Sequence, residues 1–228
     1  MRKTINCFIP YEENTAIDKV VTALKDSIVV NKIYLLTTAH GSMPSVPAGC
    51  EPFTIDSLNS SDTIKKIAQK ADTPFTLLYT KASPFELGYM ALERIADFLQ
   101  DRKTGMVYAD HYEWKEGEKK KHPAIDYQPG RGRDDFDFGA LLAFRSEYLI
   151  GAAGKMENER EDYRYAGLYA TRLFIAETGR IVHINEYLYT EIEEDNRLSG
   201  EKQFDYVNPR NREVQIEMEQ AFTGYLKR

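Results

Sequence analysis

The sequence lacks most of what a disulfide-stapled, membrane-spanning or nucleic-acid-binding protein needs. Its 228 residues include only two cysteines, Cys7 and Cys50, and Cys7 lies in an apolar run, so we expect reduced thiols. No segment approaches the roughly 20 apolar residues of a membrane span, and the apolar stretch before Pro10 is too short for a signal peptide. Lys and Arg number 30 against 36 Asp and Glu, which disfavours binding to nucleic acid. We therefore expect a cytoplasmic protein whose membrane contact is at most peripheral.

Several catalytic motifs are also missing. The chain contains no GxGxxG, no GxxxxGK[ST] and no GxSxG, which argues against a dinucleotide-binding protein, a P-loop NTPase and an α/β-hydrolase. The four histidines, His40, His111, His122 and His183, have no i,i+4 or cysteine pairing, so the spacing predicts no zinc site. The run KEGEKKKH predicts a solvated hairpin tip, with a weak contact to anionic lipid as the alternative.

What is present predicts a globular α/β protein. Hydrophobic residues make up 42% of the chain and aromatic residues 12%, enough for a sizeable core. Alternating apolar runs and amphipathic stretches predict strands at 4–9, 33–38, 52–55, 73–79, 105–114, 140–144, 181–184 and 187–190. Helices are predicted at 17–28, from Ser60 or Ser61 to Ala71, from Pro84 to Leu99, and from about Arg160 to Glu177 with a stop near Gly179. A hairpin is expected over 106–124 with its turn at Gly117, and a Gly-rich connection between 144 and 160.

This order predicts a mostly parallel central sheet flanked by helices, with an antiparallel extension. Ligands of such sheets lie beyond the carboxyl ends of the strands, so we expect the segments after Ile9, Leu36, Leu78 and Tyr108 to line the site. Residues 1–207 are interpreted as one domain and 208–228 as a C-terminal helix. That helix carries an apolar stripe and no stop signal, which indicates either docking on the domain or, the alternative we favour, a lead into a region absent from this chain.

Three segments resemble the family 2 glycosyltransferases, which have the A-type nucleotide-sugar fold. They are INCFIPYEEN, TPFTLLYTKASPFELGYMALERIADFL and ATRLFIAETGRIVHINEYLYT, and the resemblance covers roughly residues 4–190. It implies a transferase that moves a sugar, with inversion, from a nucleotide-diphosphate sugar to a carbohydrate or lipid-linked acceptor in polysaccharide or glycoconjugate synthesis. Pro10, Tyr11 and Glu12 would bind the nucleotide, with Tyr11 stacking on the base.

The chain departs from this family at the metal-binding motif. Family members usually carry an acidic residue at the end of the second strand and an Asp-x-Asp motif after the fourth, which hold a divalent metal, Mg²⁺ or Mn²⁺. Here those places read LLTTAHG and LLYTKAS, with no carboxylate between Phe75 and Ser83, so the usual metal ligands are missing. Lys81 could carry the diphosphate charge instead, since one ammonium about 4 Å from a phosphate oxygen is worth on the order of 4 kcal/mol at an effective dielectric of 20. The alternative is a solvated loop lysine.

Inverting transfer needs a carboxylate base and a cation for the leaving diphosphate. One candidate base is the pair Glu161 and Asp162, which resembles the family's acidic pair but lies about one helical turn too early when counted back from Arg172. The alternative is that both acids stabilise a helix N-terminus.

The second candidate segment is GRGRDDFDFG. Arg131 and Arg133 could bind the diphosphate, and Asp134, Asp135 or Asp137 could act on the acceptor. In an extended segment the aromatic set, Phe136 and Phe138, is buried while Asp135 and Asp137 are exposed. The alternative is a loop whose arginines neutralise its own acids. Asp110, at the end of a buried strand, lies either at the site or at the wet rim of the sheet.

Two classes of function follow. The first is an active glycosyltransferase with Asp135, Asp137, Glu161 and Asp162 as catalytic candidates and Lys81, Asp110, Arg131 and Arg133 as substrate ligands. The second is a non-catalytic carbohydrate-binding or interaction module of a longer protein, which the missing acidic motif favours. A nucleotidyltransferase should show a Gly-rich basic loop after the first strand, and PYEEN is not one.

Overall fold

The computed structural model describes residues 3–12, 17–38, 46–115, 117–128, 130, 132–192 and 209–227. Its strands are β1 (Ile5–Pro10), β2 (Val30–Thr38), β3 (Glu51–Ile55), β4 (Phe75–Tyr79), β5 (Phe85–Leu87), β6 (Thr104–Lys115), β7 (Glu118–His122), β8 (Leu141–Arg145) and β9 (Arg180–Ile192). Its helices are α1 (Asp18–Asp26), α2 (Ser61–Gln69), α3 (Ala91–Phe98), α4 (Ser146–Asn158), α5 (Gly167–Thr178) and α6 (Pro209–Leu226).

In the described residues these strands form one sheet in the order β3-β2-β1-β4-β8-β6-β9-β5, with β7 paired to β6. The pairs β1–β2, β1–β4, β2–β3 and β6–β9 are parallel. The pairs β4–β8, β5–β9, β6–β7 and β6–β8 are antiparallel. The predicted fold class is thereby confirmed: a mixed sheet whose first half alternates parallel strands with helices.

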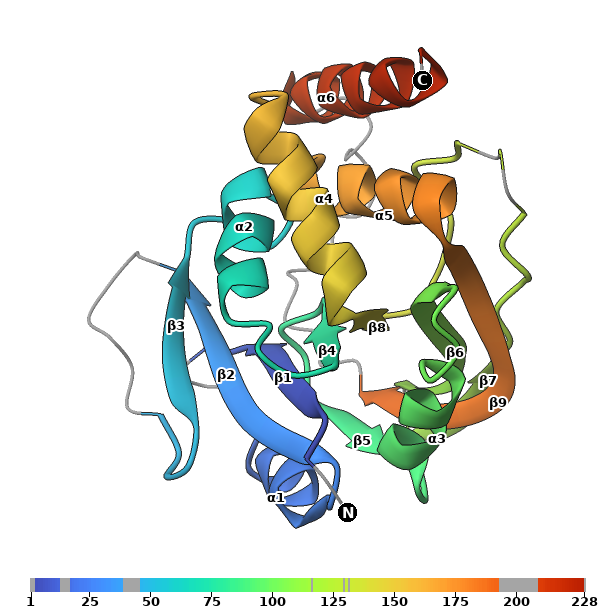
Figure 1. Ribbon diagram of the computed structural model, residues 1–228. Helices are drawn as coiled ribbons and strands as arrows, with labels where there is room; N and C mark the ends of the chain where they lie inside the picture. The colour runs from blue at the N-terminus through green and yellow to red at the C-terminus, as the bar shows by residue number, and fades with distance from the viewer. Residues whose placement is uncertain are drawn as a thin grey trace.

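Helices cover both faces of the sheet (Figure 1). On one face α1 and α3 pack over a core that includes Leu24 and Ile95. On the other face α2, α4 and α5 cover a second core, which includes Ile64 and Leu173, and α6 lies outside them. The central strands β1, β4 and β8 are apolar and almost wholly buried, as strands covered by helices on both faces must be.

Local signals explain the elements that the pattern predicts well. The side chain of Ser60 accepts a hydrogen bond from the backbone N–H of Thr63, so Ser60 is the N-cap of α2, and a serine in this position satisfies an N–H that the helix itself leaves free. Gly117, with φ +79°, supplies the left-handed turn of the β6–β7 hairpin, a conformation that costs glycine nothing.

The helix predicted from Pro84 to Leu99 is wrong in its first half. Phe85 begins β5, because its backbone pairs with Glu191 of β9 and its ring stacks on Tyr79 at 4.1 Å between centroids. Met90 then takes a left-handed conformation, φ 51°, and α3 begins only after it. Tertiary pairing therefore overrides the local helical pattern.

The segments between 144 and 192 also differ from the prediction. The expected Gly-rich connection contains α4, whose Gly151 allows the aromatic ring of Phe174 in α5 to approach closely. The late helix begins at Gly167 rather than near Arg160, which has φ 54° just after α4. The two predicted short strands are one long β9, because β6 pairs with it from Thr104 to Trp114 with register shifts on either side of Asp110.

Helix α6 packs against α5. Its Ala221 is 3% exposed, and Met218, Phe222 and Tyr225 pack on the same core. The Glu217 carboxylate accepts hydrogen bonds from the backbone N–H groups of 164, 165 and 166, immediately before α5. A carboxylate at a helix N-terminus is favoured by the free N–H groups and the helix dipole. None of the helices in the described residues is both long and apolar enough to cross a membrane.

Candidate functional site

A cavity of about 390 Å³ lies between the end of β4, the loop before β8, and helices α5 and α6. Such concave, mainly apolar spaces with a few polar groups are the usual form of ligand sites. The polar or charged side chains that line it include Asn59, Thr80, Lys81, Asp134, Asp137 and Arg172. Among the described residues of the segments expected to line the site, those after Leu78 contribute, through Thr80 and Lys81.

Arg172 of α5 is the most unusual group in this cavity. It is 5% exposed, and its Nε and Nη2 atoms find no hydrogen-bond partner among the described residues. The guanidinium lies over the ring of Tyr169 at 4.5 Å and faces Phe138 and Tyr127 at 5.4 and 5.9 Å. Burial lowers the pKa of Arg172 from its ordinary value. A buried cation with unused donors is placed to bind an anion, because the unmade hydrogen bonds cost free energy until one arrives.

The side chain of Lys81 is 53% exposed, so the interpretation as a solvated loop lysine is compatible with its exposure. Its ammonium pairs with the carboxylate of Glu191, which is 5% exposed at the end of β9. The same carboxylate accepts hydrogen bonds from the backbone N–H of Ala140 at 3.0 Å and from the Tyr189 hydroxyl at 3.2 Å. Lys81 therefore neutralises a buried acid and lines the cavity at the same time.

The resemblance implies a divalent metal at the segment after β4, and the ion pair of Lys81 with Glu191 lies at this segment. In the segment after β4 the chain offers a lysine, and its carboxylate partner among the described residues, Glu191, is already paired with it. A cation next to an ammonium group would be repelled, and Mg²⁺ or Mn²⁺ needs several free oxygen ligands. The residues here do not fit such an ion.

Asp137 brings a carboxylate into the cavity. Its Oδ1 accepts from the backbone N–H of Gly139 at 2.8 Å, and its Oδ2 lies 2.8 Å from Nε2 of His122. Burial acts to raise the pKa of Asp137, but the hydrogen bonds from Gly139 and His122 outweigh it and leave the pKa below 3.8. Asp137 is thus a carboxylate, not a carboxylic acid, at neutral pH.

Arg133 and Asp135 of the same loop do not line the 390 Å³ cavity. Phe138 is buried while Asp135 and Asp137 are exposed, as predicted for an extended segment, but Phe136, predicted to be buried too, is only half-buried. Arg133 binds both oxygens of Asp135 at 2.9 Å, as in a loop that neutralises its own charges. Both residues line a separate space of about 240 Å³, which Asp137 also borders. Arg131 lies outside the described residues.

Asp110 is buried, not at a wet rim. It is 2% exposed, and its Oδ1 accepts from the backbone N–H of Ala124 and lies 2.8 Å from Nε2 of His183. Nδ1 of His183 lies 2.8 Å from Asp126. These contacts attach the connection between β7 and β8 to the sheet, and Asp110 is not among the residues that line the 390 Å³ cavity.

The other predicted site residues lie apart from this cavity. Asp162 lines a different space of about 630 Å³, and Glu161 lies beside it in the segment between α4 and α5. Pro10 ends β1, the backbone N–H of Tyr11 donates to Leu36 at 2.8 Å, and Glu12 is exposed. Of the residues that the sequence singled out, the structure thus brings Lys81, Asp134 and Asp137 together in one cavity.

Neither Arg172 nor Glu191 is among the site residues that the sequence predicts. A signal for Arg172 exists, because an arginine on the buried side of a helix between Tyr169 and Leu173 has no solvent to face. Glu191 follows the apolar run YLYT, and an acid at the end of a buried strand is the same signal that singled out Asp110.

In comparisons with known proteins, the chain matches no protein-family model and no curated protein. It is similar in structure to glucosyl-3-phosphoglycerate synthase from Mycobacterium tuberculosis in complex with Mn²⁺, uridine-diphosphate-glucose and phosphoglyceric acid, with a TM-score of 0.52 and 10% identity over 96% of this chain and 79% of that one. It is also similar to S. aureus TarS, with a TM-score of 0.54 and 9% identity over 82% of this chain and 60% of that one. These likenesses show the A-type glycosyltransferase fold that the resemblance implied.

Proposed function

We propose that the protein transfers a sugar from a nucleotide-diphosphate sugar to an acceptor hydroxyl group. The observation that carries this proposal is Arg172, a buried cation with two unused donor nitrogens in the wall of the 390 Å³ cavity. A diphosphate supplies the anionic oxygens that such a group lacks, and a guanidinium can bind two of them at once. The fold supports the same proposal, since the similar M. tuberculosis synthase is in complex with uridine-diphosphate-glucose.

In this proposal each residue of the cavity has a separate role. Arg172 binds the diphosphate and stabilises the charge that develops as the sugar leaves. Lys81 contributes a second positive charge, offset by Glu191 until the donor binds. The nucleoside extends over the end of β1, towards Pro10, Tyr11 and Glu12, because β1 and β4 are parallel neighbours whose carboxyl ends share one edge of the sheet.

Asp137 is the base we propose for the acceptor hydroxyl. Two carboxylates, Asp134 and Asp137, line the same cavity as Arg172 and Lys81, and of these Asp137 is held in place by Gly139 and His122. Its lowered pKa keeps it ionised at neutral pH, which is the form in which a carboxylate can take a proton. Attack by the activated hydroxyl opposite the leaving diphosphate inverts the configuration of a hexosyl donor.

The finer assignments rest on the resemblance. We propose that the protein is a cytoplasmic family 2 enzyme of polysaccharide or glycoconjugate synthesis and that its acceptor is a carbohydrate or a lipid-linked molecule. Glu161 and Asp162 are the alternative base, facing the 630 Å³ space. The variants Asp137→Asn and Asp162→Asn decide between them, because only loss of the true base abolishes turnover while donor binding survives.

A thermal-shift titration tests donor binding. The full chain is titrated with a panel of nucleotide-diphosphate sugars, once with Mn²⁺ and once with chelator, since a ligand that binds the folded state raises the unfolding midpoint by mass action. We expect at least one donor to raise the midpoint in chelator. If no donor raises it under either condition, the proposal of a donor site is wrong.

One observation favours a second function, a non-catalytic carbohydrate-binding or interaction module. The Lys81–Glu191 pair replaces the metal site of the resembling family, and a fold that has lost that site can keep its binding surface. This function predicts a midpoint shift with free oligosaccharides but none with any nucleotide-diphosphate sugar.

A further inference from the structure

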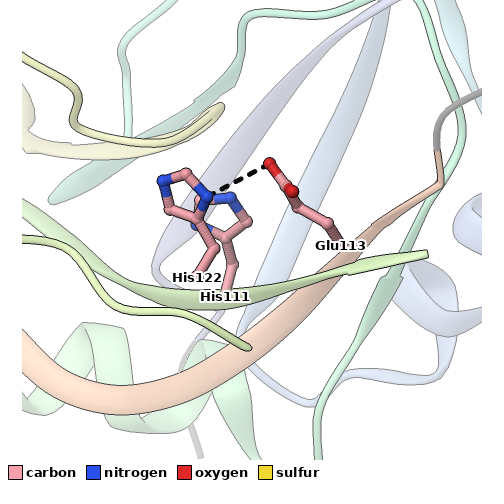
Figure 2. Close-up of side chains that lie close together, drawn as sticks. All are labelled: His111, Glu113 and His122. Atoms are coloured by element: carbon pink, nitrogen blue, oxygen red, sulfur yellow. Dashed lines mark ion pairs between the residues drawn. The ribbon is translucent and has the colours of Figure 1, made fainter. Parts of the chain in front are cut away.

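The β6–β7 hairpin brings two histidines and a glutamate together behind the cavity. His111 and His122 are directly opposite each other in the pairing of the two strands, and their rings stack at 4.4 Å between centroids with a 21° angle. Glu113 lies two positions after His111, on the same side of β6. Figure 2 shows the carboxylate of Glu113 directed towards the two rings. The spacing of the histidines along the chain missed this grouping because only strand register creates it.

His122 is oriented by a carboxylate on each ring nitrogen. Nδ1 lies 3.1 Å from Oε1 of Glu113, and Nε2 lies 2.8 Å from Oδ2 of Asp137. If Nε2–H donates to Asp137, Nδ1 is left as a lone pair facing Glu113. A histidine whose far nitrogen donates to a carboxylate is the usual arrangement of a metal ligand.

His111 supplies a second, independent observation. Its side chain is 3% exposed, and its Nδ1 has no hydrogen-bond partner among the described residues. Its Nε2 lies 3.5 Å from Oε1 of Glu191, so this ring too has a carboxylate on one nitrogen and an unused position on the other. A buried imidazole nitrogen with no partner is costly unless a ligand satisfies it.

We propose that His111, His122 and Glu113 bind a divalent transition-metal ion of the zinc class. One ligand atom from each residue lies within 4.8 Å of the other two. Two imidazoles and a carboxylate are a ligand set of three-residue zinc sites that keep a fourth position open, whereas Mg²⁺ and Ca²⁺ prefer oxygen alone.

The charges around the cluster favour a cation. Glu113, Asp137 and Glu191 all contact its histidines. The two nearby lysines already have acidic partners. Lys81 is paired with Glu191, and Lys120, which is opposite Glu113 in the strand pairing, lies 3.3 Å from Glu118.

Binding requires a small movement. Ligand atoms of a tetrahedral zinc ion lie about 3.4 Å apart, from metal–ligand distances near 2.1 Å, so the three groups must close around the ion. A metal lies in the plane of each imidazole that binds it, which stacked rings do not permit. His122 and Glu113, whose side chains are 35% and 41% exposed, have room to tilt towards the buried His111.

The ion would act on the cavity through Asp137. This residue contacts His122 and lines the space that also holds Arg172. Metal binding to His122 fixes the ring that holds Asp137 and so fixes the loop of residues 134–139. The site is separate from the segment after β4 and supplies no ligand to the diphosphate.

Cobalt titration of the untagged, metal-stripped full chain tests the proposal. Tetrahedral Co²⁺ gives a visible absorption band, and Zn²⁺ should displace it. We expect one Co²⁺ per chain. His122→Ala should weaken binding at least roughly 100-fold, and Asp137→Asn should weaken it about 10- to 100-fold through loss of the orienting carboxylate.

The matched pair Glu113→Gln and Glu118→Gln supplies the control. Both remove one negative charge from exposed or half-exposed positions of the hairpin, but only Glu113 belongs to the cluster. We expect Glu113→Gln to weaken Co²⁺ binding at least 10-fold and Glu118→Gln to leave it unchanged. Equal affinity in both, or no stoichiometric binding by the unaltered chain, would overturn the proposal. No sugar nucleotide is present, so the result is independent of the proposed transferase activity.

Discussion

Arg172 places a positive charge in the core, which lowers the free energy of unfolding of the ligand-free protein. Its Nε and Nη2 are buried and have no hydrogen-bond partner in the part of the chain that the structure describes, and each unsatisfied buried polar group costs about 1–3 kcal/mol. The cation–π contact with the Tyr169 ring at 4.5 Å offsets about 0.5–2 kcal/mol of this free energy. Replacing Arg172 by methionine, which is similar in length and apolar, should therefore stabilise the ligand-free protein by about 1–3 kcal/mol.

The same substitution should damage donor binding. Truncation of one partner of a buried charged pair costs about 2 kcal/mol or more, which corresponds to roughly 30-fold weaker affinity. Arg172→Met is thus expected to raise the unfolding midpoint, by about 2–4 °C for each kcal/mol in a chain of this size, and to weaken the binding of nucleotide-diphosphate sugar.

Chemical denaturation and calorimetric titration measure these two effects separately. Arg102→Met is the control, because Arg102 is exposed before β6 and its loss should change neither stability nor affinity. The reasoning is refuted if Arg172→Met is less stable than the unaltered protein by 1 kcal/mol or more, or if it binds the donor with unchanged affinity.

Three further changes test other parts of the structure. Glu217→Gln places an amide against backbone N–H groups that now bind a carboxylate, and urea denaturation should show a free energy of unfolding lower by about 1–3 kcal/mol. The control, Glu213→Gln at an exposed position of α6, should change the free energy of unfolding little. Equal losses in both variants would contradict the capping role of Glu217. Lys81→Ala leaves the buried Glu191 carboxylate without its cation, so both the unfolding midpoint and donor affinity should fall, and a drop in neither would show that Lys81 is dispensable. Burial raises the pKa of both thiols, and it raises the pKa of Cys7, which is 0% exposed, more than that of Cys50. Because the thiolate is the reactive form, iodoacetamide at pH 8 should modify Cys50 slowly and Cys7 only after unfolding. Mass spectrometry that finds Cys7 modified first in the native protein would contradict this.

Elements that depend on neighbours in the sequence were predictable. The strands near 4–9 and 73–79 and the helix capped at Ser60 follow from apolar periodicity and a capping side chain, which are local properties. The turn at Gly117 follows from backbone freedom at one residue. The alternation of buried Phe138 and exposed Asp137 follows from the geometry of an extended chain.

The site depended on contacts that local patterns do not contain. Lys81 was identified as a loop lysine, but its partner Glu191 comes from the far end of β9. Asp137 is one of several acids in its segment, and only the structure places it, with Asp134 but not Asp162, in the cavity that Arg172 lines. Which charges share a cavity is decided by how the loops pack, and many packings are compatible with one pattern of polar and apolar residues.

By itself the sequence determined the fold class, because a mostly parallel sheet follows from alternating apolar strands and amphipathic helices. Only the tertiary structure decided that β5 replaces the first turns of a predicted helix, since that depends on pairing with β9. Only the tertiary structure set His111 opposite His122. Both outcomes rest on strand register, which is chosen by contacts between distant segments and not by the residues of either segment alone.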